Sequence, residues 1–154
     1  MSITINTTIN GKTVSASADP SMSLLEFLRD TLEYKGTKLC CNTGECGACT
    51  VIYNGKPINS CVTLAADANG AEITTIEGLA EGDKLHPVQQ AFIDTGAVQC
   101  GYCTPGYIMS VKALLDRTKK PTQTDIEEAV SGNICRCTGY AKIVDAIQLA
   151  AQKL

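Results

Sequence analysis

Eight of the nine cysteines in this 154-residue sequence fall into two sets of four, and thiols in such numbers point first to metal chemistry. In the first set, Cys41, Cys46 and Cys49 follow a C-x4-C-x2-C pattern, and Cys61 follows after eleven intervening residues. A loop with this spacing supplies three thiolates to a plant-type [2Fe–2S] cluster. We therefore predict that these four residues hold one [2Fe–2S] cluster.

Small residues inside this loop favour the same prediction. The backbone must pass close to the sulfides of a compact cluster, and Gly44, Gly47 and Ala48 remove side chains that would block the approach. Backbone N–H groups can then point at sulfur, which offsets negative charge and raises the reduction potential. Cys40 lies one residue too far from Cys46 for the pattern, so we interpret it as a bystander.

The second set comprises Cys100, Cys103, Cys135 and Cys137. Its two pairs, C-x2-C and C-x-C, lie at predicted helix junctions. An oxidised [2Fe–2S] centre with four thiolates carries a charge of about −2, from two Fe(III), two sulfides and four thiolates. Helices expected to start at Thr104 and Thr138 would turn their positive N-terminal ends toward that charge. The second set therefore predicts a second [2Fe–2S] cluster.

Other cysteine chemistries fit less well. Either pair of the second set alone also suits a zinc half-site or a redox-active dithiol. The joint pattern favours iron, because Cys-x-Cys is uncommon as half of a zinc site and the plant-type spacing is not a zinc spacing. A secreted disulfide protein would leave one thiol over, and the N-terminal sequence lacks the basic and apolar regions of a signal peptide. We therefore expect a cytoplasmic protein.

The composition is that of a folded protein, with 44% hydrophobic and 19% charged residues. A net charge of −3 argues against general nucleic-acid binding, which needs a basic surface. No apolar stretch approaches the roughly 20 residues that span a bilayer. The sequence has no phosphate-binding loop, dinucleotide fingerprint or Ser/His/Asp set. We therefore expect the chain to carry electrons and to transform no substrate alone.

The first half of the chain is expected to form a small sheet with one helix. Strands are predicted over Ile3–Ile9, Lys12–Ala18, Thr50–Tyr53, Ile58–Leu64 and Ala71–Ile76. Asn10-Gly11 and Asn54-Gly55 predict tight hairpin turns. Ser23 and Glu26 predict a capping box at the start of the helix. These elements indicate an α+β fold.

The second half is expected to be helical. The composition shifts at Glu77–Asp83, which we interpret as a linker between domains over residues 1–77 and 78–154. Four short helices are predicted beyond it. Their expected end signals are Gly96 and Gly132 as stops and Thr104, Thr124 (with Glu127) and Thr138 as N-caps. His86, the single histidine, precedes the first helix and is interpreted as a cap or an exposed residue.

Three segments resemble the small iron–sulfur subunit of molybdenum hydroxylases, the xanthine dehydrogenase family. These segments are Thr37–Val51, Gln99–Gly106 and Gly132–Tyr140, which occur in the family's order and with its spacings. The resemblance covers nearly the whole chain. It implies an N-terminal plant-ferredoxin-like β-grasp domain followed by an all-α four-helix domain, within a molybdenum-dependent oxidoreductase.

The resemblance also implies partners and a route for electrons. The cluster of the second set would lie nearest the molybdopterin cofactor of a large subunit, where Gln99 would hydrogen-bond the pterin and Cys137 would lie beside its amino group. The cluster of the first set would lie nearer solvent or an FAD-binding subunit. Electrons would run from molybdenum through both clusters to FAD or another acceptor, in a hetero-oligomer such as a dimer of heterotrimers.

Several alternatives remain open at this point. Many members of the family have glycine where Cys40 stands, whereas some purine-oxidising bacterial members have cysteine, so the resemblance at this position favours a xanthine dehydrogenase-like complex. Small subunits of nicotinate, CO or aldehyde dehydrogenases also fit, as does 4-hydroxybenzoyl-CoA reductase, in which the electron flow is reversed. Outside the family, the alternatives are a free-standing ferredoxin-type carrier and a zinc-stabilised interaction module. The helical half argues against the carrier, which needs only one exposed cluster.

Overall fold

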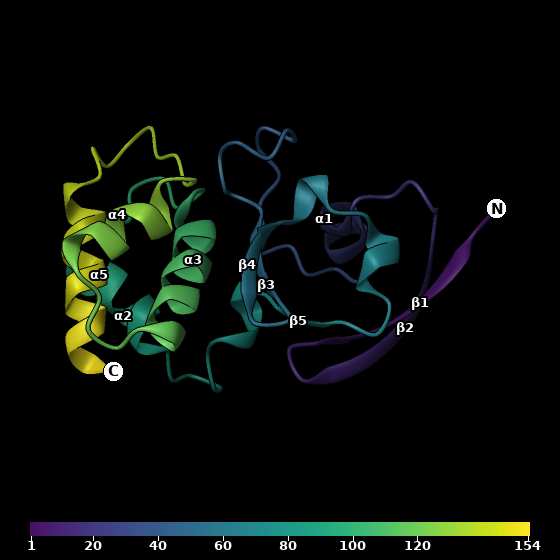
Figure 1. The fold of residues 1–154 in the computed structure, drawn as a ribbon, viewed down its shortest axis with the longest axis horizontal. Coiled ribbons are helices and arrows are strands. Elements are labelled where there is room, and N and C mark those ends of the chain that lie inside the picture. Colours follow the sequence, from purple (N-terminus) through teal and green to yellow (C-terminus); the bar gives the residue numbers. More distant parts are fainter.

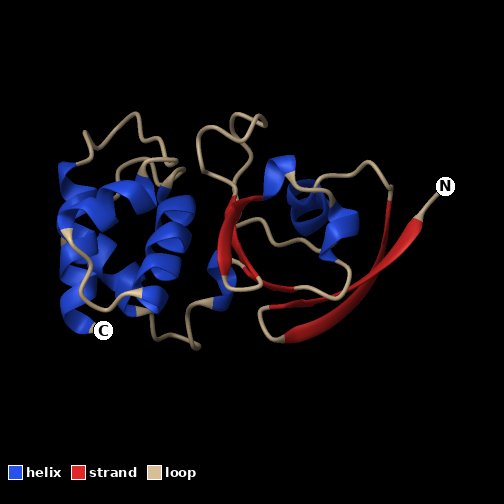
Figure 2. Cartoon of the chain, viewed as in Figure 1, coloured by secondary structure: helices blue, strands red, loops and turns tan.

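The computed structural model describes residues 1–154. They form two halves that lie side by side along the long axis, one built on a β-sheet and the other on helices (Figure 1). The first half contains β1 (Ile3–Ile9), β2 (Lys12–Ala18), α1 (Leu24–Glu26), a π-helical turn η1 (Phe27–Thr31), β3 (Thr50–Tyr53), β4 (Lys56–Asn59), 3-10 turns η2 (Ser60–Val62) and η3 (Ala65–Ala68), and β5 (Glu72–Thr74). A last short turn, η4 (Ile76–Gly78), leads to α2 (Pro87–Asp94), α3 (Thr104–Arg117), α4 (Gln123–Val130) and α5 (Ala141–Lys153). The α+β prediction is confirmed, and Figure 2 separates the strands from the four longer helices.

The five strands form one mixed sheet in the order β2-β1-β5-β3-β4, in which only β1 and β5 run parallel. Both predicted hairpins form. Asn10, Gly11, Asn54 and Gly55 all have positive φ, as type I′ turns require. The predicted capping box of Ser23 and Glu26 is also present at the start of α1.

The strand predicted over Ile58–Leu64 is mostly wrong, because β4 ends at Asn59 and η2 follows. The N–H and hydroxyl of Ser60 both donate to the Cys49 carbonyl, at 3.3 and 2.7 Å. These bonds turn the chain toward the cysteine loop. The turn leaves Cys61 buried beside that loop, where a continuing strand would carry it away.

Strand β3 joins the two halves because both of its faces are buried. Successive side chains of a strand point to opposite faces. Val51 packs in the core of the sheet half, and Ile52 packs in the helical core. Helix α3 lies against β3 and β4. It is therefore covered by the sheet on one side and by the other helices on the rest, which explains why most of its residues are buried.

The ends of α2 follow the sequence prediction. The helix finishes just before Gly96, which has a φ of +68°. At its start, His86 Nδ1 accepts the Val88 N–H at 3.2 Å, which confirms the capping interpretation. None of the helices has the length and apolarity to cross a bilayer.

Three predicted N-caps are wrong. Thr104 is the first residue of α3 instead of its cap, and Cys103 holds the cap position. Helix α4 is capped by Thr122, since a Thr122–Asp125 capping box two residues earlier competes with the predicted box and starts the helix at Gln123. Helix α5 starts after Tyr140, because the hydroxyl of Thr138 is directed to a cysteine. The predicted stop at Gly132 lies two residues beyond the end of α4.

Candidate metal centres

The loops that carry the cysteines lie along one side of the molecule, at the top of Figure 1. The loop before β3 carries the first set, apart from Cys61 on η2, and the loops before α3 and α5 carry the second. All nine cysteines are free of disulfide bonds. Segments far apart in sequence therefore present reduced thiols on a common side.

In the first set, backbone donors point at sulfur as the sequence predicted. Cys41 Sγ accepts the N–H groups of Thr43 (3.5 Å) and Cys46 (3.4 Å), and these bonds lower the pKa of Cys41 to about 5. Burial and the neighbouring Cys49 thiol raise the pKa of Cys61 to about 12, against a smaller lowering effect from the Gly44 backbone. A site that buries thiols at this cost suits a cation, which favours their deprotonated form.

Thiols of each set interact with one another, and no group of three or more is arranged to hold a single metal ion. Cys41 and Cys40 both interact with Cys46, and Cys49 interacts with Cys61. In the second set, Cys103 interacts with Cys135, and Cys100 interacts with Cys137. A [2Fe–2S] cluster takes four thiolates, two on each iron, so the four neighbouring thiols predicted as ligands in each set suit one such cluster.

In the second set, one pair is inside and the other is at the surface. Cys135 is buried and Cys103 half-buried, whereas Cys100 and Cys137 are exposed. Burial raises the pKa of Cys103 to about 12. Burial also opposes ionisation of Cys135, but hydrogen bonds from the hydroxyl and N–H of Thr138 outweigh it and lower the pKa to about 7. The inner pair thus contains one thiol that readily becomes a thiolate ligand.

All four cysteines of the second set line one apolar cavity of about 200 Å³. Cys40 and Cys46 of the other loop also reach this cavity, so it lies between the two sets. Cys40 is exposed and its thiol interacts with that of Cys46. Its neighbour Leu39 accepts a hydrogen bond from the Tyr102 hydroxyl, which comes from the loop between Cys100 and Cys103.

Direct hydrogen bonds join the two cysteine loops. The Ile134 N–H donates to the Cys46 carbonyl at 3.0 Å, and Asn133 Nδ2 donates to the Gly47 carbonyl at 3.1 Å. Ser110 of α3 holds the other end of the Asn133 amide through a 2.8 Å bond to Oδ1. The sequence analysis missed Asn133, and its position two residues before Cys135 is the only feature of the sequence that points to it.

Two glycines permit this approach. A Cβ on Gly47, whose φ is +68°, would clash with the Gly132 carbonyl and the Asn133 amide. A Cβ on Gly106 in α3 would clash with the Gly47 carbonyl oxygen. The requirement for glycine at Gly47 thus comes from the helical half as well as from space around a cluster.

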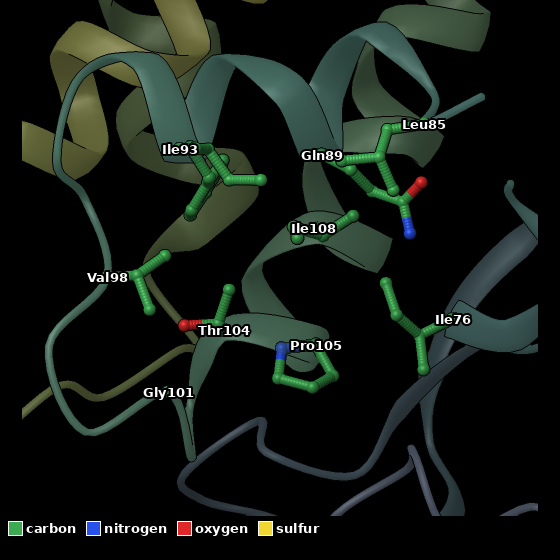
Figure 3. A pocket seen from close by; sticks show the side chains of 10 residues that line it. Ile76, Leu85, Gln89, Ile93, Val98, Gly101, Thr104, Pro105 and Ile108 are labelled. Carbon is green, nitrogen blue, oxygen red and sulfur yellow. The ribbon is translucent and has the colours of Figure 1, made fainter. Parts of the chain in front are cut away.

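A separate apolar cavity of about 280 Å³ lies between η4, α2 and α3 (Figure 3). The exposed side chains of Leu85, Ile93 and Val98 line it, and Gln89 and Thr104 are the polar side chains of its wall. Val98 directly precedes Gln99, which is exposed. This groove is therefore continuous with the surface around Gln99 and Cys100.

Two family models match the chain. Residues 7–76 match a 2Fe-2S iron-sulfur cluster binding domain, and residues 75–148 match a [2Fe-2S] binding domain. Together with the neighbouring thiols, these matches define an iron–sulfur protein with two [2Fe–2S] domains.

Proteins with similar sequences identify the family within this class. The nicotinate dehydrogenase small FeS subunit of Eubacterium barkeri is 49% identical over 98% of this chain and 96% of its own length. The xanthine dehydrogenase iron-sulfur-binding subunit of Escherichia coli O157:H7 is 50% identical over 94% and 92%, respectively. The chain belongs to the small iron–sulfur subunits of the molybdenum hydroxylase family, which confirms the resemblance described above.

Solved structures agree with this assignment. Quinoline 2-oxidoreductase from Pseudomonas putida 86 superposes with a TM-score of 0.95 at 41% identity, over 98% of this chain and 94% of that chain. The aldehyde oxidoreductase from Desulfovibrio desulfuricans ATCC 27774 gives a TM-score of 0.94 at 42% identity. There the match covers 97% of this chain but 17% of the other, so the equivalent region is one part of a much longer polypeptide.

Proposed function

We propose that this chain relays single electrons between a molybdopterin site on a large partner subunit and an FAD subunit or another acceptor. The relay uses a plant-ferredoxin-like β-grasp domain over residues 1–77 and a four-helix domain over residues 78–154. The observation that carries the proposal is that the free thiols lie in two adjacent loop groups, with one apolar cavity lined by cysteines of both groups. A [2Fe–2S] cluster, when bound, supplies one-electron chemistry and no bond-making.

The proposed ligands are Cys41, Cys46, Cys49 and Cys61 for the ferredoxin-like cluster and Cys100, Cys103, Cys135 and Cys137 for the helical-domain cluster. The hydrogen bond from the Ile134 N–H to the Cys46 carbonyl supports transfer between them, because it joins a ligand of one cluster to the neighbour of a ligand of the other. Cys40 remains outside the ligand set, although it lies beside Cys46.

The large subunit is proposed to cover the surface around Gln99, Cys100 and Cys137. These residues are all exposed, as groups that contact a pterin on another chain need to be. The adjoining groove exposes Ile93 and Val98, and apolar patches that adjoin polar groups are typical of docking sites. Gln99 and Cys137 would then contact the pterin, and the inner pair of Cys103 and Cys135 would face the ferredoxin-like cluster.

Substrate choice is proposed to lie with the large subunit. The relatives named nicotinate dehydrogenase and xanthine dehydrogenase subunits are 49% and 50% identical to this chain, so its sequence similarity does not favour one of these substrates over the other. The site supports the same proposal, because the two cavities near the clusters are lined mainly by apolar side chains and by the cysteines proposed as cluster ligands.

Native purification with metal analysis tests the proposal. We expect the chain to co-elute in size-exclusion chromatography with a large molybdenum-containing chain, and to contain about four irons and essentially no zinc. A native monomer with iron would favour the free-standing carrier. A zinc-containing, iron-free protein would favour the interaction module and end the proposal.

A further inference from the structure

Thr138 lies beside the buried ligand of the second set instead of capping a helix. Its hydroxyl donates to Cys135 Sγ at 3.1 Å, and its backbone N–H donates to the same sulfur at 3.4 Å. Helix α5 starts only after Tyr140, so the hydroxyl has no capping bond to make. A side chain that sequence analysis assigned to helix geometry is thus directed at a sulfur.

A small network fixes the direction of this hydroxyl. The Tyr140 N–H donates to Thr138 Oγ1 at 3.4 Å, which occupies an acceptor position and leaves the single hydroxyl proton for sulfur. Tyr140 in turn has a φ of +70°, and its hydroxyl accepts the Cys135 N–H at 3.3 Å. The backbone and side chains of these three residues therefore hold one another in place.

The surroundings make this bond effective. Cys135 is 7% exposed and lines the apolar cavity between the two sets. Electrostatic interactions are stronger in such a site than in water. In the first set, Thr43 also lies beside a ligand sulfur, but its hydroxyl is shared between that sulfur and Glu45 Oε2, which lies at 3.3 Å. The Thr138 hydroxyl has the Cys135 sulfur as its one acceptor, so the two sets differ in how fully a threonine hydroxyl is directed to sulfur.

We infer that the Thr138 hydroxyl raises the reduction potential of the helical-domain cluster relative to that of the ferredoxin-like cluster. Reduction takes a four-thiolate cluster from a charge of about −2 to about −3, and the ligand sulfurs share the added charge. A hydrogen bond to one of them stabilises the reduced form more than the oxidised form. The inference rests on the proposed function, and in it Thr138 acts on electron transfer through its hydrogen bond to Cys135.

Substitution by an isosteric residue without the hydroxyl tests this role. In the iron-loaded full-length chain, we expect Thr138→Val to lower the equilibrium constant for one-electron reduction of the helical-domain cluster about three- to tenfold. A tenfold change corresponds to about 59 mV for a one-electron couple. A redox titration followed by electron paramagnetic resonance measures both clusters at once, and the ferredoxin-like cluster should not change.

Two further variants complete the comparison. Thr138→Ser keeps the hydroxyl and should keep the wild-type potential. Thr95→Val removes a hydroxyl that bonds the Ala91 carbonyl at 2.8 Å, away from any cysteine, and should change neither potential. Thr138→Ala removes the donor without added bulk and replaces Thr138→Val if the valine variant binds iron poorly.

The outcomes separate this inference from the proposed function. Unchanged potentials in Thr138→Val or Thr138→Ala overturn the inference, and so does loss of the cluster from both of them when Thr138→Ser retains it. A potential that also falls in Thr138→Ser counts against it too, because the hydroxyl is then not the cause. Absence of a second cluster from the wild-type protein would instead overturn the proposed function.

Discussion

At the level of single residues, N–H and O–H donors stabilise ligand thiols as thiolates. The donors to Cys41 and Cys135 come from residues two, three and five positions along the chain. These short sequence separations mean that a cysteine loop creates much of its own environment. The proposed ligands should therefore be separable by substitution, one loop at a time.

Replacing a proposed ligand of one set should remove the cluster of that set and leave the cluster of the other set in place. We expect Cys46→Ser to lower the iron content from about four to about two per chain and to abolish one of two paramagnetic signals of the reduced protein. Cys135→Ser should abolish the other signal. Iron analysis and electron paramagnetic resonance measure both effects.

Cys40→Ser is the matched control for these variants, because Cys40 adjoins the proposed ligand Cys41 and contacts Cys46. It should keep both signals and the full iron content. Loss of iron from Cys40→Ser, or disappearance of both signals together in a folded Cys46→Ser protein, would contradict the assignment of ligands.

The cysteines could be read from spacing alone, because thiolates from one loop must reach a compact cluster. The roles of Asn133 and Thr138 could not. Asn133 bonds Gly47 across 86 positions of the chain, a separation that no local pattern encodes. Thr138 fits the preferences of an N-cap equally well, and only the observed start of α5 excludes that role.

At the level of elements, the N-terminus of α2 depends on a titratable cap. Burial lowers the pKa of His86 below its ordinary value of 6.5, and protonation of Nδ1 would break its bond to the Val88 N–H. The unfolded chain therefore takes up the proton at a higher pH than the folded chain. As the pH falls below about 6.5, the free energy of unfolding should decrease until the folded-state pKa is passed.

Substitution of this cap should separate capping from titration. His86→Asn supplies an uncharged N-cap, so it should keep the stability at pH 7.5 and lose less than the wild type when the pH falls to 5.5. His86→Ala should cost about 1 kcal/mol at pH 7.5. Apparent unfolding temperatures at both pH values measure this, and equal pH sensitivity of wild type and His86→Asn would refute it.

The contact between α3 and the cysteine loop makes a second prediction at this scale. A Cβ at Gly106 would clash with the Gly47 carbonyl and lie 3.1 Å from Ala48 Cα, and both groups are backbone. Gly106→Ala should therefore cost about 1–3 kcal/mol in the free energy of unfolding. Gly132→Ala, where no atom lies within 4 Å of the added Cβ, should stay within about 0.5 kcal/mol. Denaturation of both variants tests this, and equal losses would exclude the clash as the cause.

The elements themselves were largely predictable, and their ends less so. Hairpins at Asn10-Gly11 and Asn54-Gly55 depend on φ values that few residues adopt, so two letters of sequence determine them. Threonine caps are weaker signals, since Thr122 and Thr124 both precede a suitable carboxylate at the required distance. The strand beyond Asn59 was overestimated because the bonds from Ser60 to Cys49 cross between segments.

At the level of the whole molecule, the junction between the halves is the part least visible in sequence. The composition shift near Glu77 marks the change from strands to helices, but it does not indicate how the two halves pack against each other. One sign was present, because a strand with Val51 and Ile52 in succession is apolar on both faces and needs a partner on each. Which helix supplies the second partner follows only from the observed packing of α3.

The exposed groove beside Gln99 should respond to a change of charge. We expect Val98→Asp to weaken association with the large molybdenum subunit at least tenfold, because a carboxylate in an apolar contact must lose its hydration. Thr13→Asp adds the same charge on the exposed face of β2 and should bind normally. Co-purification from a strain expressing all subunits measures both variants, and equal recovery would remove the groove from the interface.

The position of His86 has a consequence for electron transfer through this protein. Lys112, Asp116 and Lys119 influence its charge, so it lies toward the C-terminal half of α3, whereas Cys103 caps the N-terminal end of that helix. Histidine is the side chain that ordinarily titrates between pH 5 and 8, and this chain has one. An electron that passes between the cysteine loops therefore meets no imidazole there that could take up a proton.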